Sequence, residues 1–278
     1  MNETAIASAV NRFASAPIAM LEREIQPMLD ARSRVTMRAG FWDDLYEIEP
    51  EEKQLHVNRG IATIEVNGAL GLGLAEWEKQ WCGMTDVDDV SRLVGEAARR
   101  SDVTAIVLAM NSPGGSVSGI TELAEKIRAA RAQKPVIAWS RSICASAAYW
   151  IAAQASVVYA APSAIIGSIG VYTVFYDISK AYDQAGYRAI LVKAGANKAI
   201  GVPGIPVTDD QLKTIQERVD TMYGMFTADV VSGRGSAVDK ASFDGSDWFA
   251  RAAMERGLID EIHPDFEAVM QQVAQLVE

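Results

Sequence analysis

Residues 142–176 contain no charged side chain, although 22% of the residues in the chain are charged. A run of this length is long enough to cross a bilayer as a helix. However, Gln154, Pro162 and Gly167 interrupt it, and many of its other residues are alanine. This composition favours a buried helix followed by a strand and a turn, so we expect no membrane span.

Strands and helices are expected to alternate along most of the chain. Residues 103–110 form a near-continuous apolar run of strand length, which suits a strand that is covered on both faces. Further strands are predicted at 59–67, 135–139, 157–160, 165–175 and 188–193, and helices at 86–100, 120–132, 147–155, 178–185 and 208–231, with a turn, helix and strand within 245–262 and a helix at the C-terminus. Such alternation indicates an α/β fold built from βαβ units.

Composition divides the chain into three parts. Residues 1–55 form an arm that ends in the acidic stretch 43–53, residues 56–265 hold the α/β pattern, and residues 266–278 form a C-terminal helix. The arm is expected either to dock as a helix on a solvated tether, or to contact a partner or be removed by processing. Its start has no basic region followed by an apolar core, so it does not resemble a secretory signal.

Charge and cysteine content exclude several classes of function. The net charge is −10 and the pI is about 4.8, which argues against nucleic acid as the main partner. Two cysteines and two histidines make neither a disulfide framework nor a zinc site, so we expect no metal and no other cofactor. A reducing, cytoplasmic setting is expected.

The sequence Asn-Ser-Pro-Gly-Gly at residues 111–115 follows the apolar run. Glycines let a substrate backbone approach closely, and their N–H groups can face developing negative charge. Gly114 and Gly115 are therefore candidate oxyanion donors. Taken alone, the segment is more typical of an ordinary turn between a strand and a helix. A phosphate cradle is disfavoured because the motifs GxGxxG and GxxxxGK[ST] are absent.

Ser146 lies among small residues where a buried strand gives way to a helix. Helix N-termini carry unpaired N–H donors and a positive end. A serine at this position is either an N-cap or a nucleophile, and the GxSxG motif of one nucleophile class is absent.

A serine nucleophile needs a base. His56 and His263 lie outside glycine- and serine-rich loops, which disfavours a Ser-His-Asp triad. Lys198 lies in a loop of small apolar residues, with no acidic residue between positions 190 and 208. A desolvated lysine can act as the base, although most loop lysines are solvated. Ser168 is either a turn serine or a group that holds the lysine amine.

Together these segments resemble the signal peptide peptidase A-like family, serine-peptidase family 49, over roughly residues 58–263. The resemblance rests on the apolar strand before Asn-Ser-Pro-Gly-Gly, on Ser146 in a small-residue motif, on PSAIIGSIGV at 162–171 and on the glycine-flanked Lys198. Lys198 follows Ser146 by 52 residues, a spacing similar to that of the family. Residues 208–235 and 247–262 also look like family segments.

The resemblance implies a crotonase-like α/β spiral, shared with the Clp proteases, that carries a Ser-Lys dyad. Ser146 would attack the peptide carbonyl, and Lys198 would take its proton. Gly114, Gly115 and the N–H of Ala147 would stabilise the oxyanion. Family members assemble into rings in which neighbouring protomers can share one site, so a homo-oligomer is expected.

In such a site Ser168 would orient the lysine. The chain departs from the family at Ala147 and Ala148, where glycines are common, and the two methyl groups would narrow the site. A short acidic member without a recognisable membrane anchor resembles the phage branch, whose capsid assembly proteases cut scaffold, portal or coat proteins. The expected substrates are such proteins and the chain itself, within the host cytoplasm or the prohead.

Three alternatives remain open. The first is a soluble cellular protease of the signal-peptide peptidase kind, and the second is a catalytically inactive oligomeric scaffold. The third, a crotonase-like acyl-CoA enzyme, is disfavoured because residues 142–176 hold no carboxylate.

Overall fold

The computed structural model describes residues 18–20, 49, 52–174 and 176–277. The chain forms two compact units, which are described separately. The first consists of Met1–Ile18 and Val171–Gly224, and the second of Ala19–Gly170 and Met225–Glu278. Most of the expected arm, residues 1–55, lies outside the described residues.

The second unit is built on an eight-stranded sheet in which β11-β10-β8-β6-β3-β2 is the main order, and β9 pairs with both β8 and β12. The strands are β2 (His56–Asn58), β3 (Ile61–Asn67), β6 (Ala105–Ser112), β8 (Val136–Ala145), β9 (Val157–Ala160), β10 (Ile165–Gly167), β11 (Asp247–Phe249) and β12 (Glu261–Ile262). Strands β3, β6, β8 and β10 run parallel, whereas β2 and β11 pair antiparallel at the edges. This arrangement confirms the expected α/β class.

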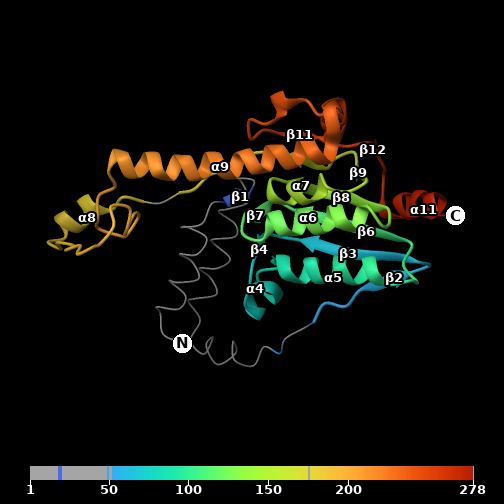
Figure 1. Ribbon diagram of the computed structural model, residues 1–278, viewed down its shortest axis with the longest axis horizontal. Helices are drawn as coiled ribbons and strands as arrows, with labels where there is room; N and C mark the ends of the chain where they lie inside the picture. Colours follow the sequence, from blue (N-terminus) through green and yellow to red (C-terminus); the bar gives the residue numbers. More distant parts are fainter. Residues whose placement is uncertain (1–17, 21–48, 50–51, 175, 278) are drawn as a thin grey trace. The chain divides into compact units, whose positions relative to one another are not determined.

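Helices cover both faces of this sheet (Figure 1). Three helices, α5 (Val87–Arg99), α6 (Ile120–Arg131) and α7 (Ala147–Ala152), lie along one face. On the other face, α11 (Phe266–Val277) packs Val269 and Val273 against Val107, Ile137 and Trp139. Because β6 is covered on both faces, residues 105–108 are fully buried, which explains their continuous apolar sequence.

A smaller sheet has the order β1-β7-β4-β5. Its strands are β1 (Ile18–Met20), β4 (Leu70–Gly71), β5 (Thr85–Asp86) and β7 (Gly114–Ser116). Strand β4 follows β3 and β7 follows β6, so two strands of the large sheet each turn directly into the small one. At Gly115 a side chain would collide with the backbone of Leu70, so glycine is needed for β7 to pair with β4.

Helix α9 (Asp209–Arg234) is the longest helix described. It begins after Thr208, whose hydroxyl accepts a hydrogen bond from the Gln211 amide (3.3 Å), while the Gln211 side chain accepts one from the Thr208 amide (3.1 Å). This reciprocal pair is a capping box. The helix predicted at 208–231 is confirmed, and it extends three residues further, to Arg234. Residues 225–234 of α9 belong to the second unit, where Phe226 stacks on Trp150 of α7 with ring centroids 4.5 Å apart.

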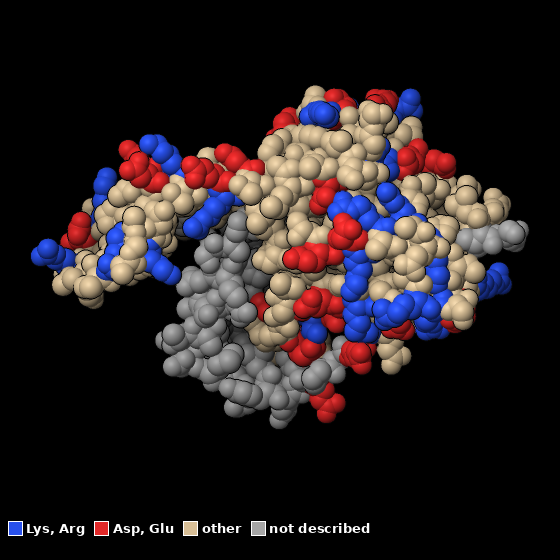
Figure 2. All heavy atoms as spheres, viewed as in Figure 1, with Lys and Arg blue, Asp and Glu red and all other residues tan. Residues whose placement is uncertain are grey.

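The remaining short elements of the second unit are α4 (Glu76–Gln80), α10 (Ala250–Glu255) and the 3-10 turns Gly235–Ala237 and Lys240–Ser242. Figure 2 shows both acidic and basic side chains on the face that carries α5 and α6. Among the described residues, no helix combines the length and the apolar character that a membrane crossing requires.

One predicted strand is absent from the structure, and another is shorter than predicted. Residues 188–193 form no strand, and the described residues place no neighbouring strand beside them; Ile190 is 82% exposed and Val192 is 92% exposed. Strand propensity depends on a neighbour to pair with, so an apolar β-branched run alone does not make a strand. The strand expected at 165–175 ends at Gly167, because Gly167 (φ 117°) and Ser168 (φ 52°) turn the chain away.

In the first unit the described residues hold α8 (Ser179–Gln184) and the first part of α9. The helix predicted at 178–185 is thereby confirmed within a residue at each end.

Candidate active site

Strands β6 and β8 deliver two candidate segments to the same edge of the large sheet. Ser112, the last residue of β6, pairs with Cys144 of β8. Gly114 and Ser146 each follow this pair by two residues. Because the strands are parallel, the candidate nucleophile and the candidate oxyanion loop leave the sheet side by side.

Ser146 has an unusual backbone conformation for a residue that carries a side chain. It sits between β8 and α7 with φ 54° and ψ −124°, and it is 1% exposed. Its amide donates to the carbonyl oxygen of Gly167 (2.7 Å), and its own carbonyl oxygen accepts from Trp150 (2.8 Å). A non-glycine residue in this region costs about 1–3 kcal/mol, and such residues gather at functional sites.

The Ser146 hydroxyl does not cap the helix that follows. No hydrogen bond from the first turn of α7 reaches its side chain, and Oγ instead lies 3.4 Å from the carbonyl oxygen of Gly170. The ordinary N-cap interpretation is therefore not what the structure shows. Ala147 and Ala148, the departures from the family pattern, are fully buried at the start of α7.

The Gly114–Gly115 turn lies on the small sheet. Gly114 adopts φ 101°, which favours glycine, and its amide donates to the hydroxyl of Ser112 at 3.2 Å. Ser112 is fully buried, so its hydroxyl holds the turn in place. Sequence reasoning gave Ser112 no role; its position in Asn-Ser-Pro-Gly-Gly, two residues before the turn, was the available signal.

Ser168 also has a fixed backbone. Its φ is 52°, its side chain is largely buried, and its amide donates to the carbonyl oxygen of Ser246 (2.7 Å). The amide of Gly245 in turn donates to the carbonyl oxygen of Ile169 (3.1 Å). The loop before β11 thus holds residues 168–169 next to the segment that accepts the Ser146 amide.

Lys198 lies in the first unit and is exposed. It sits on a turn in which its amide donates to the carbonyl oxygen of Gly195 (3.2 Å). The structure therefore brings Gly114, Gly115, Ser146, Ala147 and Ser168 into one unit and places Lys198 in the other.

Neither histidine shares a site with Ser146. His56, in the edge strand β2, pairs with Thr63 of β3. Thr63 in turn pairs with Val107 of β6, and Val107 with Ile137, which lies near the beginning of β8 rather than at its end. The ring of His263 lies tilted by 57° against the ring of Tyr159, with centroids 4.5 Å apart, and contacts the Glu261 carboxylate (3.2 Å).

Cys144 is not a competing nucleophile. It is fully buried, and burial raises the pKa of its thiol far above the usual range. The thiolate is the reactive form, so this thiol is inert in the folded chain.

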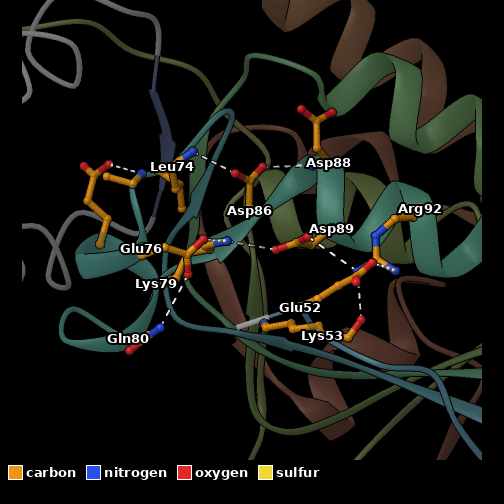
Figure 3. Close-up of polar contacts among 12 residues, drawn as sticks. Glu52, Lys53, Leu74, Glu76, Lys79, Gln80, Asp86, Asp88, Asp89 and Arg92 are labelled. Atoms are coloured by element: carbon orange, nitrogen blue, oxygen red, sulfur yellow. Dashed lines mark hydrogen bonds and ion pairs between the residues drawn. The ribbon is translucent and has the colours of Figure 1, made fainter. Parts of the chain in front are cut away.

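The Asp86 carboxylate stabilises the β5 edge of the small sheet. Asp86, the last residue of β5, accepts hydrogen bonds from the amides of Gly73 (3.3 Å), Leu74 (2.7 Å) and Asp88 (3.0 Å). Figure 3 shows the Asp86 side chain between Leu74 and Asp88. The carboxylate caps α5 and holds the loop after β4, the strand that pairs with Gly115.

The chain before β2 is anchored beside this region. Arg92 on α5 donates to the carbonyl oxygen of Lys53 (2.8 Å) and lies 3.5 Å from the Glu52 carboxylate (Figure 3). The side chain of Gln80 donates to the carbonyl oxygen of Glu49 (3.0 Å). The end of the acidic linker therefore lies alongside α4 and α5.

Several known proteins are similar to this chain. Capsid assembly protease C of Escherichia phage lambda is 29% identical over 79% of the chain and 50% of its own length. The head-tail preconnector protein of Enterobacteria phage P21 is 30% identical over 74% of the chain and 41% of its own length. Protease 4 of Haemophilus influenzae is 30% identical over 82% of the chain and 37% of its own length. The chain thus spans half or less of the length of these relatives.

Solved structures also align with it. A membrane-bound stomatin-specific protease matches 78% of this chain and 86% of its own, with 13% identity and a TM-score of 0.47. An enoyl-CoA hydratase from Shewanella pealeana matches 82% of this chain and 74% of its own, with 11% identity and a TM-score of 0.45. At these TM-scores neither alignment bears on the site.

The chain also matches a model of a protein family. The model described as peptidase family S49 matches residues 128–278, which is more than half of the chain and includes Ser146, Ser168 and Lys198. The chain belongs to peptidase family S49.

Proposed function

We propose that this chain is a serine endopeptidase in which Ser146 is the nucleophile and Lys198 the general base. The observation that carries the proposal is the backbone of Ser146, a buried non-glycine residue with φ 54° at the sheet edge that it shares with Gly114. The folded chain maintains this conformation at a cost in free energy. A serine with no side-chain capping role gains nothing structural from it.

In the proposed reaction the Ser146 hydroxyl attacks the substrate carbonyl while its proton passes to the lysine amine. The amides of Gly114, Gly115 and Ala147 are the proposed oxyanion donors. The Gly114 amide already donates to Ser112 at 3.2 Å, so in this role it would be shared between Ser112 and the oxyanion. Ser168 is proposed to orient the lysine.

The proposed base has to be removed from water. A lysine acts as a base only when neutral, and removal from water favours the neutral form. Lys198 is exposed, as are Tyr176 (81%), Ile190 (82%) and Val192 (92%) in the same unit. We infer that a second copy of the chain covers this unit in a homo-oligomer and removes water from Lys198.

The proposed substrates are phage structural proteins. This part of the proposal rests on the two phage relatives, named for capsid assembly and for the head-tail preconnector. Cleavage of the chain itself and of scaffold, portal or coat proteins fits that role. A cellular role is the alternative, because Protease 4 of Haemophilus influenzae is similarly related.

The test is the intact mass of wild-type chain and of Ser146→Ala and Lys198→Ala after incubation, with and without a capsid or scaffold protein from the same phage. We expect cleavage by the wild type alone. Lys193→Ala is the matched control, since Lys193 is an exposed lysine in the same unit. Normal cleavage by Ser146→Ala would overturn the proposal.

One observation favours a second candidate, an inactive oligomeric scaffold. Ala147 and Ala148 add two buried methyl groups where glycines are common in the family. A fluorophosphonate probe separates the two, because it labels Ser146 only if the serine is activated. If the chain is a slow enzyme, Ala147→Gly/Ala148→Gly is expected to increase labelling of Ser146. If the chain is an inactive scaffold, Ser146 is expected to stay unlabelled in this variant as well.

A further inference from the structure

The small sheet contains a strand from the N-terminal region. In the order β1-β7-β4-β5, strand β7 has β4 on one side and β1 (Ile18–Met20) on the other. Ala19 and Met20 belong to the same unit as β7, and Figure 1 shows β1 next to β7. A segment far from the sheet in sequence thus occupies one edge of β7.

That edge belongs to the candidate active site. Strand β7 consists of Gly114, Gly115 and Ser116, and it begins two residues after the pairing of Ser112 with Cys144. Helix α7, which starts directly after Ser146, packs against β7. A chain lying along β7 therefore lies beside both the nucleophile and the proposed oxyanion donors.

An edge strand binds an extended segment through its backbone groups. Gly115 has no side chain, and β4 occupies the other edge of β7, so the edge filled by β1 is the one that remains for a peptide. Recognition there depends on backbone hydrogen bonds more than on side chains, which suits a partner that is any extended polypeptide.

We propose that Ile18–Met20 occupies in cis the edge at which a peptide substrate must pair, so the N-terminal segment is a tethered competitive inhibitor of the site. This inference rests on the proposed function. A tethered strand competes at an effective concentration on the order of millimolar, so a free peptide binds well only after the strand has left. The region before β2 is then a regulatory segment rather than a passive tether.

The experiment uses the full-length chain and the double variant Ala19→Pro/Met20→Pro. Successive N–H groups of a strand point to opposite sides, so replacing two neighbouring residues removes at least one donor that faces β7. Ala7→Pro/Ser8→Pro, upstream in the same region and outside β1, is the matched control. Neither pair includes a proposed catalytic residue.

The first readout does not require catalysis. In a Ser146→Ala background, hydrogen exchange is followed in peptides covering residues 112–117. Faster exchange in the Ala19→Pro/Met20→Pro chain than in the control shows that β1 protects β7. Equal exchange overturns the proposal, whether or not the chain is a peptidase.

The second readout is cleavage of an added peptide. We expect KM to fall at least about tenfold in Ala19→Pro/Met20→Pro, with kcat little changed, because the competing strand has been removed. An unchanged KM in an active enzyme overturns the inhibition while leaving the peptidase function intact. Inhibition that increases with protein concentration would identify a second copy as the occupant and overturn the proposal in cis.

Discussion

The amide of Ser146 donates to the carbonyl oxygen of Gly167 at 2.7 Å, which ties the candidate nucleophile to the end of β10. Gly167 pairs with Ala145, so this hydrogen bond continues the ladder between β8 and β10 by one residue. It therefore helps to hold Ser146 at φ 54° and ψ −124°. Glycine adopts this conformation with little strain, whereas any other residue there is strained.

This strain predicts different stabilities for two inactive variants. Ser146→Gly and Ser146→Ala both remove the hydroxyl, but only glycine relieves the backbone. We expect the free energy of unfolding of Ser146→Gly to exceed that of Ser146→Ala by about 1 kcal/mol, after the entropy cost of glycine in the unfolded chain. Urea denaturation of the two variants measures the difference. Equal stability, or a more stable alanine variant, would show that Ser146 is not strained.

Two glycines in α9 predict opposite effects of one substitution. A methyl group at Gly233 would collide with the carbonyl of Ala153, whereas one at Gly224 meets no atom within 4 Å among the described residues outside its own helix backbone. We expect Gly233→Ala to lower the free energy of unfolding by about 1–3 kcal/mol through overpacking. Gly224→Ala should raise it by up to about 1 kcal/mol through helix propensity. Thermal or urea unfolding measures both, and effects of the same sign would contradict the close contact of α9 with the end of α7.

Replacing Asp86 with alanine is expected to destabilise the chain more than replacing its neighbour Asp88. Asp86→Ala leaves the amides of Gly73, Leu74 and Asp88 without their acceptor. We expect a loss of about 1–3 kcal/mol from the missing cap and the three part-buried hydrogen bonds. Asp88→Ala is the control, because Asp88 is exposed in the first turn of α5 and should cost under about 1 kcal/mol. Similar losses for the two would show that the loop after β4 does not depend on Asp86.

Burial of Cys144 predicts selective alkylation. Because burial raises the pKa of the Cys144 thiol, the native chain should form no adduct there with a maleimide, while the half-buried Cys82 reacts. Intact mass should show one adduct in the native wild-type chain, none in native Cys82→Ser, and two in wild type unfolded in urea. An adduct in native Cys82→Ser would mean that the end of β8 opens to solvent.

Much of the second unit could be predicted from the sequence because its signals are local. The continuous apolar run at 103–110 predicted a strand covered on both faces, and β6 is that strand. Strand β9 has the predicted bounds, Val157–Ala160, and α5 lies within the predicted 86–100. These features depend on period and burial, which neighbouring residues in the sequence already encode.

The first unit could not be predicted in the same way. The run at 188–193 has strand composition, but the described residues hold no strand that pairs with it. Whether such a run becomes a strand depends on a partner, which the run itself does not specify.

The sequence by itself determined the α/β class, and it pointed to Ser146, Lys198 and the Gly114–Gly115 turn as candidates, because residue types and their order carry that information. Only the tertiary structure decided the strained backbone of Ser146, the hydrogen bond from the Gly114 amide to the Ser112 hydroxyl and the pairing of β1 with β7. Each of these depends on a residue's surroundings in the fold. For Ser146 the partner is Gly167, twenty-one residues away, and β1 lies almost a hundred residues before β7. Such distances are closed by folding, and no local pattern in the sequence records them.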